Sequence, residues 1–124
     1  MRNTAILILS LAFSLVMAGS AMAQPSYPSE FPDAFPQYEG CKMVQTMNFP
    51  ENVTAMLDCG QTPMQEVYDF YKNGGVQNGW QVLMENNSAD FMLIMLEKDD
   101  TAMQVQVYNN NSVTQAGLSY VKKK

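Results

Sequence analysis

The clearest hydrophobic pattern of the chain runs between its two cysteines, Cys41 and Cys59. Apolar and polar residues alternate on both sides of the segment NFPEN (48–52), which predicts an antiparallel hairpin that turns in this segment. The expected cross-strand pairs are Cys41–Cys59, Met43–Leu57, Gln45–Ala55 and Met47–Val53 on one face, and Lys42–Asp58, Val44–Met56 and Thr46–Thr54 on the other.

This register predicts a disulfide between Cys41 and Cys59. The Cβ atoms of directly opposed residues in an antiparallel pair lie about 4.5–5.5 Å apart, which a small adjustment brings within disulfide range. A reactive thiol pair would favour Cys-x-x-Cys spacing near the start of a helix, and these cysteines do not have that spacing. We therefore expect a structural disulfide, which stabilises the fold by about 3 kcal/mol on the chain-entropy estimate.

The segment TPMQEVYDFYK, which follows the hairpin, has the signals of a helix start. Thr62 is the expected N-cap, Pro63 takes the first helical position, and Gln65 completes a capping box. Apolar residues recur at helical spacing, so one face of the helix should pack on a sheet. A Gly-Gly pair later in the segment would cost roughly 1 kcal/mol per residue inside a helix. We expect the helix to run from Pro63 to about Asn78, with Asn78–Gly79 as its C-terminal cap.

Four further strands are expected after the helix, because alternating or apolar runs are separated by short turn segments. The predicted strands span residues 80–86, 91–98, 101–109 and 112–122. The predicted fold class is α+β, with a single helix packed on an antiparallel sheet and the element order β-β-α-β-β-β-β.

One predicted strand differs from its neighbours, because FMLIML (91–96) is apolar at six consecutive positions. A strand with a helix on one side and water on the other should alternate, so this run either buries both faces or exposes three large side chains. We weigh a partner-binding surface against coverage by Phe31 and Phe35 of the preceding segment. The residues expected in such a surface are the apolar Val44, Met56 and Leu83 with a polar rim of Gln104, Gln106 and Gln115.

The first residues have the three parts of a secretory signal peptide: a short basic start, an apolar stretch and AGSAMA before the cleavage point. We expect cleavage between Ala23 and Gln24, export to the periplasm or the medium, and no membrane span after processing. The predicted organisation is a signal peptide (1–23), a lead-in segment rich in proline and aromatic residues (24–40) and a small domain (41–124).

The charge of the chain narrows its possible partners. It has 12 acidic and 7 basic residues and a net charge of −5, which argues against nucleic acid because that partner attracts basic surfaces. Histidine, the commonest general base, is absent. There is no nucleophile elbow and no phosphate-binding glycine motif, and the pair Asp99–Asp100 lies in a predicted turn. We therefore expect no enzymatic activity, no metal and no cofactor.

Methionine is the unusual feature of the composition, with 11 residues. In an exported protein, clustered thioethers can hold Cu(I), whereas methionines also fill core gaps or form adaptable binding faces. Met92 and Met95 have Met-x-x-Met spacing but should point to opposite faces of a strand. The leading hypothesis is a non-enzymatic exported module that binds a protein partner or itself; a copper-binding protein and a small hydrolase are the alternatives.

The stretches FPQYEGCKMV and EVYDFYKNGGVQNGW resemble a family of small exported bacterial α+β domains. Those domains have a Pro-x-Tyr-Pro-Gly-Ala motif before the first strand and a Phe-Tyr…Gly-Trp motif at the end of the helix. The resemblance covers residues 35–121 and departs from the pattern at Glu39, Cys41 and Gly75, where proline, alanine and leucine are usual. It implies an exported α+β domain and carries over no active-site residue.

Overall fold

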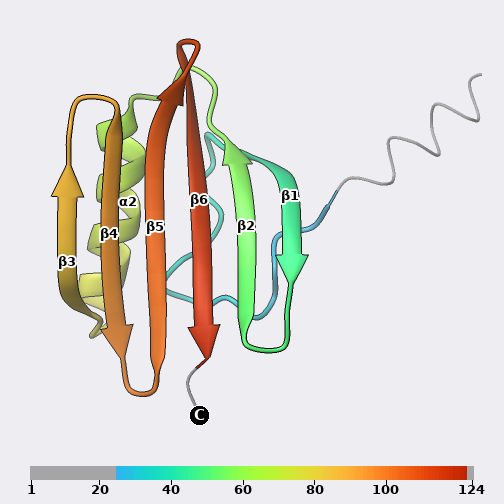
Figure 1. Cartoon of the computed structure of the whole chain (residues 1–124), viewed down its shortest axis with the longest axis vertical. Coiled ribbons are helices and arrows are strands. Elements are labelled where there is room, and N and C mark those ends of the chain that lie inside the picture. Colours follow the sequence, from blue (N-terminus) through green and yellow to red (C-terminus); the bar gives the residue numbers. More distant parts are fainter. Residues whose placement is uncertain (1–24, 123–124) are drawn as a thin grey trace, which may run out of the picture.

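The structure, a computed structural model, describes residues 25–122. The predicted leader and its cleavage point lie outside these residues. Six antiparallel strands form one sheet in the order β1-β2-β6-β5-β4-β3, with one helix, α2, behind it (Figure 1). The elements are β1 (Lys42–Asn48), β2 (Asn52–Asp58), α2 (Met64–Gln77), β3 (Gln81–Asn87), β4 (Phe91–Lys98), β5 (Thr101–Asn110) and β6 (Val113–Lys122).

The predicted order of elements agrees with the structure. The predicted α+β class is wrong, because the chain has much more strand than helix. Strands make up half of residues 25–122, and α2, the helix found among these residues, has only 14 residues. The backbone of α2 lies close to the backbones of β3 to β6 but not to those of β1 or β2. The described chain is therefore a mostly antiparallel sheet, because the lead-in segment, rather than more helix, covers the remainder of that sheet face.

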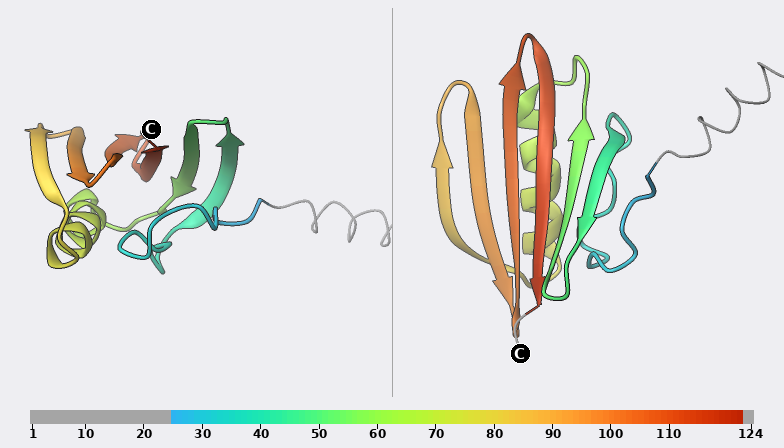
Figure 2. Two further views of the ribbon diagram at one scale, coloured as in Figure 1. Left: turned by 90° about the horizontal axis from the view of Figure 1, so that it is seen from below. Right: turned by 45° about the vertical axis from the view of Figure 1, so that its right-hand side comes forward.

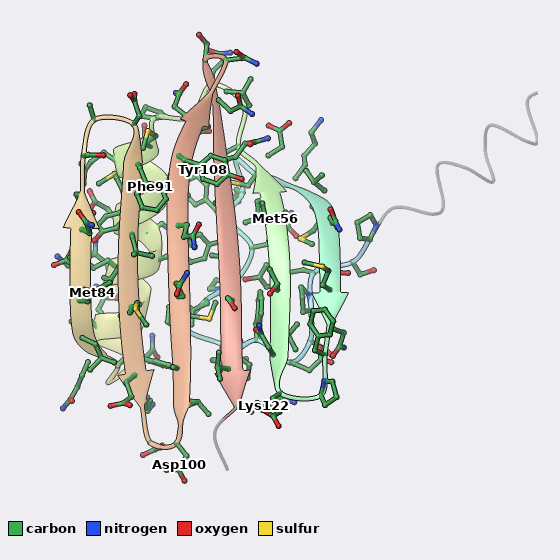
Figure 3. The ribbon with its side chains drawn as sticks, in the orientation of Figure 1. Met56, Met84, Phe91, Asp100, Tyr108 and Lys122 are labelled. Carbon is green, nitrogen blue, oxygen red and sulfur yellow. A yellow bond between two sulfur atoms is a disulfide. The ribbon has the colours of Figure 1, made fainter. Side chains whose placement is uncertain are left out.

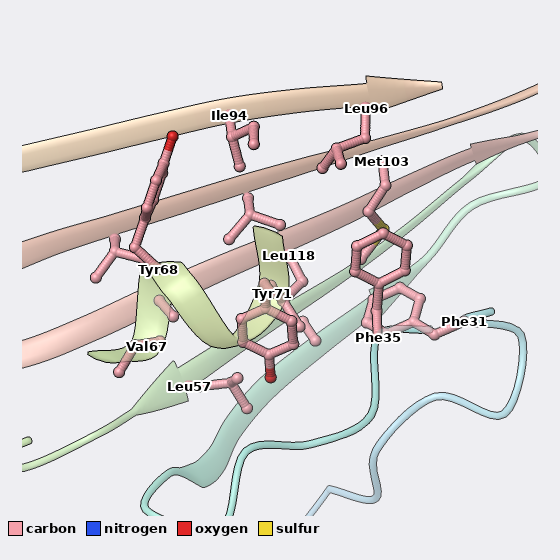
Figure 4. Packing of buried hydrophobic residues seen from close by; sticks show 14 of the residues in the cluster. Phe31, Phe35, Leu57, Val67, Tyr68, Tyr71, Ile94, Leu96, Met103 and Leu118 are labelled. Atoms are coloured by element: carbon pink, nitrogen blue, oxygen red, sulfur yellow. The ribbon is translucent and has the colours of Figure 1, made fainter. Parts of the chain in front are cut away.

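The helix packs on the sheet through large buried side chains. Val67, Tyr68 and Tyr71 of α2 are at most 2% exposed. They lie over the buried side chains of the strands, as Figure 4 shows for Leu57, Ile94, Leu96, Met103 and Leu118. These residues alternate with outward-facing positions along each strand, as expected for a sheet with its core on one side.

The lead-in segment lies on the same side of the sheet as α2 (Figure 2). Phe35 is fully buried and meets the ring of Trp80 edge-on, with 5.0 Å between the ring centroids. The Tyr27 hydroxyl donates a hydrogen bond to the carbonyl of Phe35, and the Tyr38 N–H donates to the Tyr71 hydroxyl at 3.1 Å. Burial raises the pKa of Tyr71 to about 12, so the hydroxyl stays neutral at any physiological pH. The lead-in is thus part of the core.

Two glycines inside α2 allow this close packing. A Cβ on Gly74 would lie 2.6 Å from the carbonyl oxygen of Ala34, and one on Gly75 would lie 2.9 Å from Leu96 and 3.1 Å from Phe35. The low helix propensity of glycine is offset by these contacts, so the helix continues through the pair. Its predicted end is confirmed: Asn78 is the C-cap, and Gly79 follows with a φ of +89°.

The predicted start of α2 is wrong by one residue, and the capping box does not form. Pro63 has an extended backbone and occupies the N-cap position, where no side chain caps the helix. Gln65 instead donates a hydrogen bond to Asp69 one turn later, at 2.9 Å. The fixed φ of proline is compatible with the N-cap as well as with the first helical position, so the sequence signal does not distinguish them.

The hairpin has the predicted disulfide and turn, but only part of the predicted register. Cys41 and Cys59 are bonded and buried, and Lys42–Asp58 and Met43–Leu57 pair as expected. A β-bulge at Val44 then shifts the remaining pairs by one residue. The observed pairs are Gln45–Met56, Thr46–Ala55 and Met47–Thr54 in place of Gln45–Ala55, Val44–Met56, Thr46–Thr54 and Met47–Val53.

Replacing Cys41 and Cys59 together with alanine should lower the free energy of unfolding by about 3 kcal/mol without changing the fold, because the open chain gains entropy when unfolded. Urea denaturation followed by circular dichroism measures the change. As a control, thiol titration of the unfolded, unreduced protein should detect no free sulfhydryl. Two reactive thiols per chain in protein from its native compartment would contradict the prediction.

Replacing Gly74 with alanine should destabilise the protein by about 1–3 kcal/mol, although alanine is the better helix former, because the added methyl group overlaps the Ala34 carbonyl. Asn73→Ala, at the exposed neighbouring position, is the matched control and should be neutral or slightly stabilising. Thermal unfolding at a single pH compares the two. A Gly74→Ala protein as stable as the control would show that the lead-in does not need this close approach.

Candidate protein-binding face

The sheet surface opposite α2, here named the helix-free face, is built from rows of side chains that cross all six strands. Directly paired residues of antiparallel strands share a face, so the register defines each row. The two middle rows consist of Gln45, Met56, Gly117, Gln106, Leu93 and Asn86, and of Met47, Thr54, Ser119, Gln104, Met95 and Met84. Neither row contains a charged residue.

Strand β4 places large apolar side chains on this face. Met92, Ile94 and Leu96 are buried beneath α2, so the alternate residues Phe91, Leu93 and Met95 belong to the helix-free face. Phe91 is 36% exposed. The expected alternative, coverage by Phe31 and Phe35, is wrong because both residues lie in the core on the helix side. No other segment of residues 25–122 forms a second layer over β4 on the helix-free side (Figure 2).

A hollow of about 440 Å³ opens in the middle of the helix-free face. It lies over Gly117, where β6 has no side chain, and the sulfur of Met56 is 3.5 Å from the position that a Cβ on Gly117 would take. Phe91 and Tyr108 are paired residues of β4 and β5 at one end of the hollow (Figure 3). Its lining residues are Thr54, Met56, Phe91, Gln104, Gln106, Tyr108, Gly117, Leu118 and Ser119.

The structure brings together some of the residues predicted for this surface. Met56, Gln104 and Gln106 line the hollow. Gln115 pairs with Tyr108 in the adjoining row. These four residues come from β2, β6 and β5, which are neighbours in the sheet although β2 is far from the other two in the chain.

Val44 and Leu83 lie at the two edges of the sheet rather than beside the hollow. Each falls at a β-bulge, Val44 in β1 and Leu83 in β3, and each is more than half exposed. Because β1 and β3 are at opposite edges, the expected continuous apolar patch of Val44, Met56 and Leu83 does not form. The large apolar side chains of this face come mainly from β4 instead.

Sequence reasoning missed the residues that shape the hollow. Gly117 interrupts an otherwise regular strand pattern, and a glycine inside a strand signals a close approach or a gap, so it could have been recognised. Tyr108 continues the outward positions of Gln104 and Gln106 along β5. Thr54 and Ser119 become neighbours only through the pairing of β2 with β6, which joins segments 65 residues apart.

The ionic contact between the sheet and α2 lies on the helix side of the sheet, away from the helix-free face. Glu85 of β3 accepts hydrogen bonds from the Tyr68 hydroxyl at 2.5 Å and from the Lys72 ammonium at 2.9 Å. These bonds, with the Tyr68 bond the larger effect, lower the pKa of Glu85. Burial, with the bond to Glu85, raises the pKa of Tyr68 to about 12. The contact connects an edge strand to the helix and leaves the helix-free face uncharged at its centre.

Within residues 25–122, no three His, Cys, Asp or Glu side chains gather as a potential metal site. Met92 and Met95 lie on opposite faces of β4, as expected. In the same part of the chain, no helix has the length and apolar character needed to cross a membrane.

Comparison with known protein families identifies the family of this chain. The model of the family described as START domain-like matches residues 42–116, from the start of β1 into β6 and more than half of the chain. The chain belongs to the START domain-like family. The helix-grip arrangement of START-like folds is compatible with the element order observed here. No curated protein matches the sequence of this START-like domain. The lead-in segment lies outside the matched region.

Glu85→Gln in this START-like domain should remove a small pH-dependent stabilisation. Because the pKa of Glu85 is lower in the folded than in the unfolded protein, its contribution is present above the ordinary glutamate pKa and is lost as the pH falls through the lowered value. The pair with Lys72 is partly exposed, so the difference near pH 7 should be at most about 1 kcal/mol. Urea denaturation between pH 3 and 7 measures it, with the exposed Glu39→Gln as control. A difference that grows at low pH would contradict this assignment.

Proposed function

We propose that this START-like domain is an exported, non-enzymatic module that binds a protein through its helix-free face. The observation that carries the proposal is the combination of an apolar strand, β4, with a hollow on a sheet face that no described segment covers. Large exposed apolar patches on small proteins are typical of interaction sites. The amide and hydroxyl groups around the hollow supply the few polar contacts that such a site needs for orientation.

Two features favour binding over catalysis. START-like domains generally bind ligands and do not catalyse reactions. The chain also has no histidine, and the lining of the hollow has no carboxylate, lysine or cysteine that could act as acid, base or nucleophile. The chemistry of the face is therefore that of a contact surface.

Export is part of the proposal and rests on two observations. The leader pattern ends in AGSAMA, and the Cys41–Cys59 bond is of the kind that persists in oxidising compartments. The net charge of −5 and the uncharged centre of the face support a protein partner rather than nucleic acid. Intact mass of the exported protein should correspond to a chain that begins at Gln24.

A photo-reactive phenylalanine analogue at Leu93 tests the proposed face. We expect it to form a specific covalent adduct with a protein in the native compartment, because Leu93 lies beside Gln106 in the middle of the face. The same analogue at Asn73, exposed on α2, is the matched control and should give no adduct. Adding Met95→Glu to the Leu93 probe should abolish the adduct, since a charge would then enter the apolar contact.

Circular dichroism and thermal unfolding must show that the probe variants are folded. Equal labelling from Leu93 and Asn73, or an adduct that survives Met95→Glu, would contradict the helix-free face as the binding surface. Absence of any adduct from Leu93 in a folded protein would contradict the proposed function.

A further inference from the structure

The polar groups at the centre of the helix-free face can pair with copies of themselves. Gln104 and Gln106 of β5 project between Ser119 and Gly117 of β6 and Met95 and Leu93 of β4. A glutamine amide has both donors and an acceptor, so two identical amides can form hydrogen bonds with each other. The hydroxyl group of Thr54 also has a donor and an acceptor, whereas that of Ser119 donates to Asn52 at 2.8 Å and can still accept a hydrogen bond. A charged centre would instead repel its own copy.

The distribution of charge on the helix-free face is also compatible with contact between two copies of the chain. The whole chain has a net charge of −5, yet the two middle rows of the face are uncharged across all six strands. Two acidic molecules can therefore approach through this face without placing like charges opposite each other at the centre. A strongly basic or acidic partner would find no complementary charge there.

The area of the face is of the order that a stable dimer requires. Five gaps of about 4.8 Å between strands and a strand length of about 25 Å give a projected area of roughly 600 Å². Standard protein interfaces bury about 800 Å² on each partner. Side-chain relief increases the contact area above the projected value. Two such faces can pack as the two layers of a β-sandwich, about 10 Å apart.

The sheet edges are less suited to self-association than the face. The edge strands β1 and β3 each contain a β-bulge, at Val44 and Leu83. Bulges interrupt the regular ladder that a further strand would extend, and native proteins use them to discourage pairing of edges. The face, in contrast, consists of regular strands β2, β6, β5 and β4 around the hollow.

We propose that the partner of the helix-free face is the helix-free face of a second copy of this chain, related by a twofold axis. This inference rests on the proposed function and names its partner. If the whole face is in contact, the twofold axis passes near the centre of the face, between β6 and β5. Gly117 and Gln106 are paired at this point. Gln106 of one copy then lies close to Gln106 of the other.

Charge exchange at Gln106 tests this arrangement. The exported chain with its disulfide intact should sediment at twice the chain mass in analytical ultracentrifugation. Gln106→Glu and Gln106→Lys should each weaken the dimer at least about tenfold, because like charges then meet at the axis, whereas an equimolar mixture of the two should regain dimers of mixed composition. The same pair of substitutions at Asn73, exposed on α2, should leave the dissociation constant unchanged.

The outcomes separate the inference from the proposed function. A protein that remains monomeric at all accessible concentrations, or a dimer insensitive to Gln106, overturns the inference. If the Leu93 photo-adduct has twice the chain mass, the inference is supported. If its second component is a different protein and the purified chain is monomeric, the proposed function stands and the inference fails. Circular dichroism establishes that each variant is folded, and Ser119→Glu with Ser119→Lys repeats the exchange at the other central strand.

Discussion

The close approach of α2 to the lead-in segment and to β4 is the constraint on which the rest of the structure depends. It is possible only because positions 74 and 75 have no side chain: the backbone of Ala34 and the side chains of Leu96 and Phe35 occupy that space. Helix α2 can therefore pack closely on the sheet and cover one sheet face together with the lead-in segment (Figure 2). Every large aromatic ring of the lead-in that is buried is buried on this side.

This arrangement produces a strongly one-sided sheet. The helix side contains the disulfide, the aromatic cluster and the ionic contact between Glu85 and Lys72. The helix-free face contains no covering element within the described residues, although β4 places Phe91, Leu93 and Met95 there. An antiparallel sheet tolerates water on one face when that face is polar, and β5 meets this requirement with glutamines whereas β4 does not. The contrast between these adjacent strands is the reason to propose that this face binds a partner.

Membership of the START domain-like family explains some features of the structure, and the particular residues of this chain explain others. The family match covers the sheet and the helix, which accounts for the arrangement of the elements. It does not cover the lead-in, whose phenylalanines complete the core, nor Cys41, which ties the start of β1 to the end of β2. The bulges at both sheet edges and the gap at Gly117 are features of this chain's strands. Together they favour the centre of one face over the edges for the proposed contact.

Local sequence signals determined the order of the elements, the bounds of β4, the end of the helix and the pairing of the cysteines, because each depends on residues close together in the chain. Tertiary packing decided the remainder. The bulge at Val44 shifts the register that alternation alone predicted and thereby moves Gln45 and Met47 to the other face of the sheet, a change that the local pattern of β1 does not record. Which face the lead-in covers is likewise a matter of space: its phenylalanines fit beside the glycine pair of α2, and no local pattern encodes that distance. The candidate site was also only partly predictable from the sequence. The apolar run in β4 is visible in the sequence, whereas the hollow forms only when β2, β6 and β5 come together.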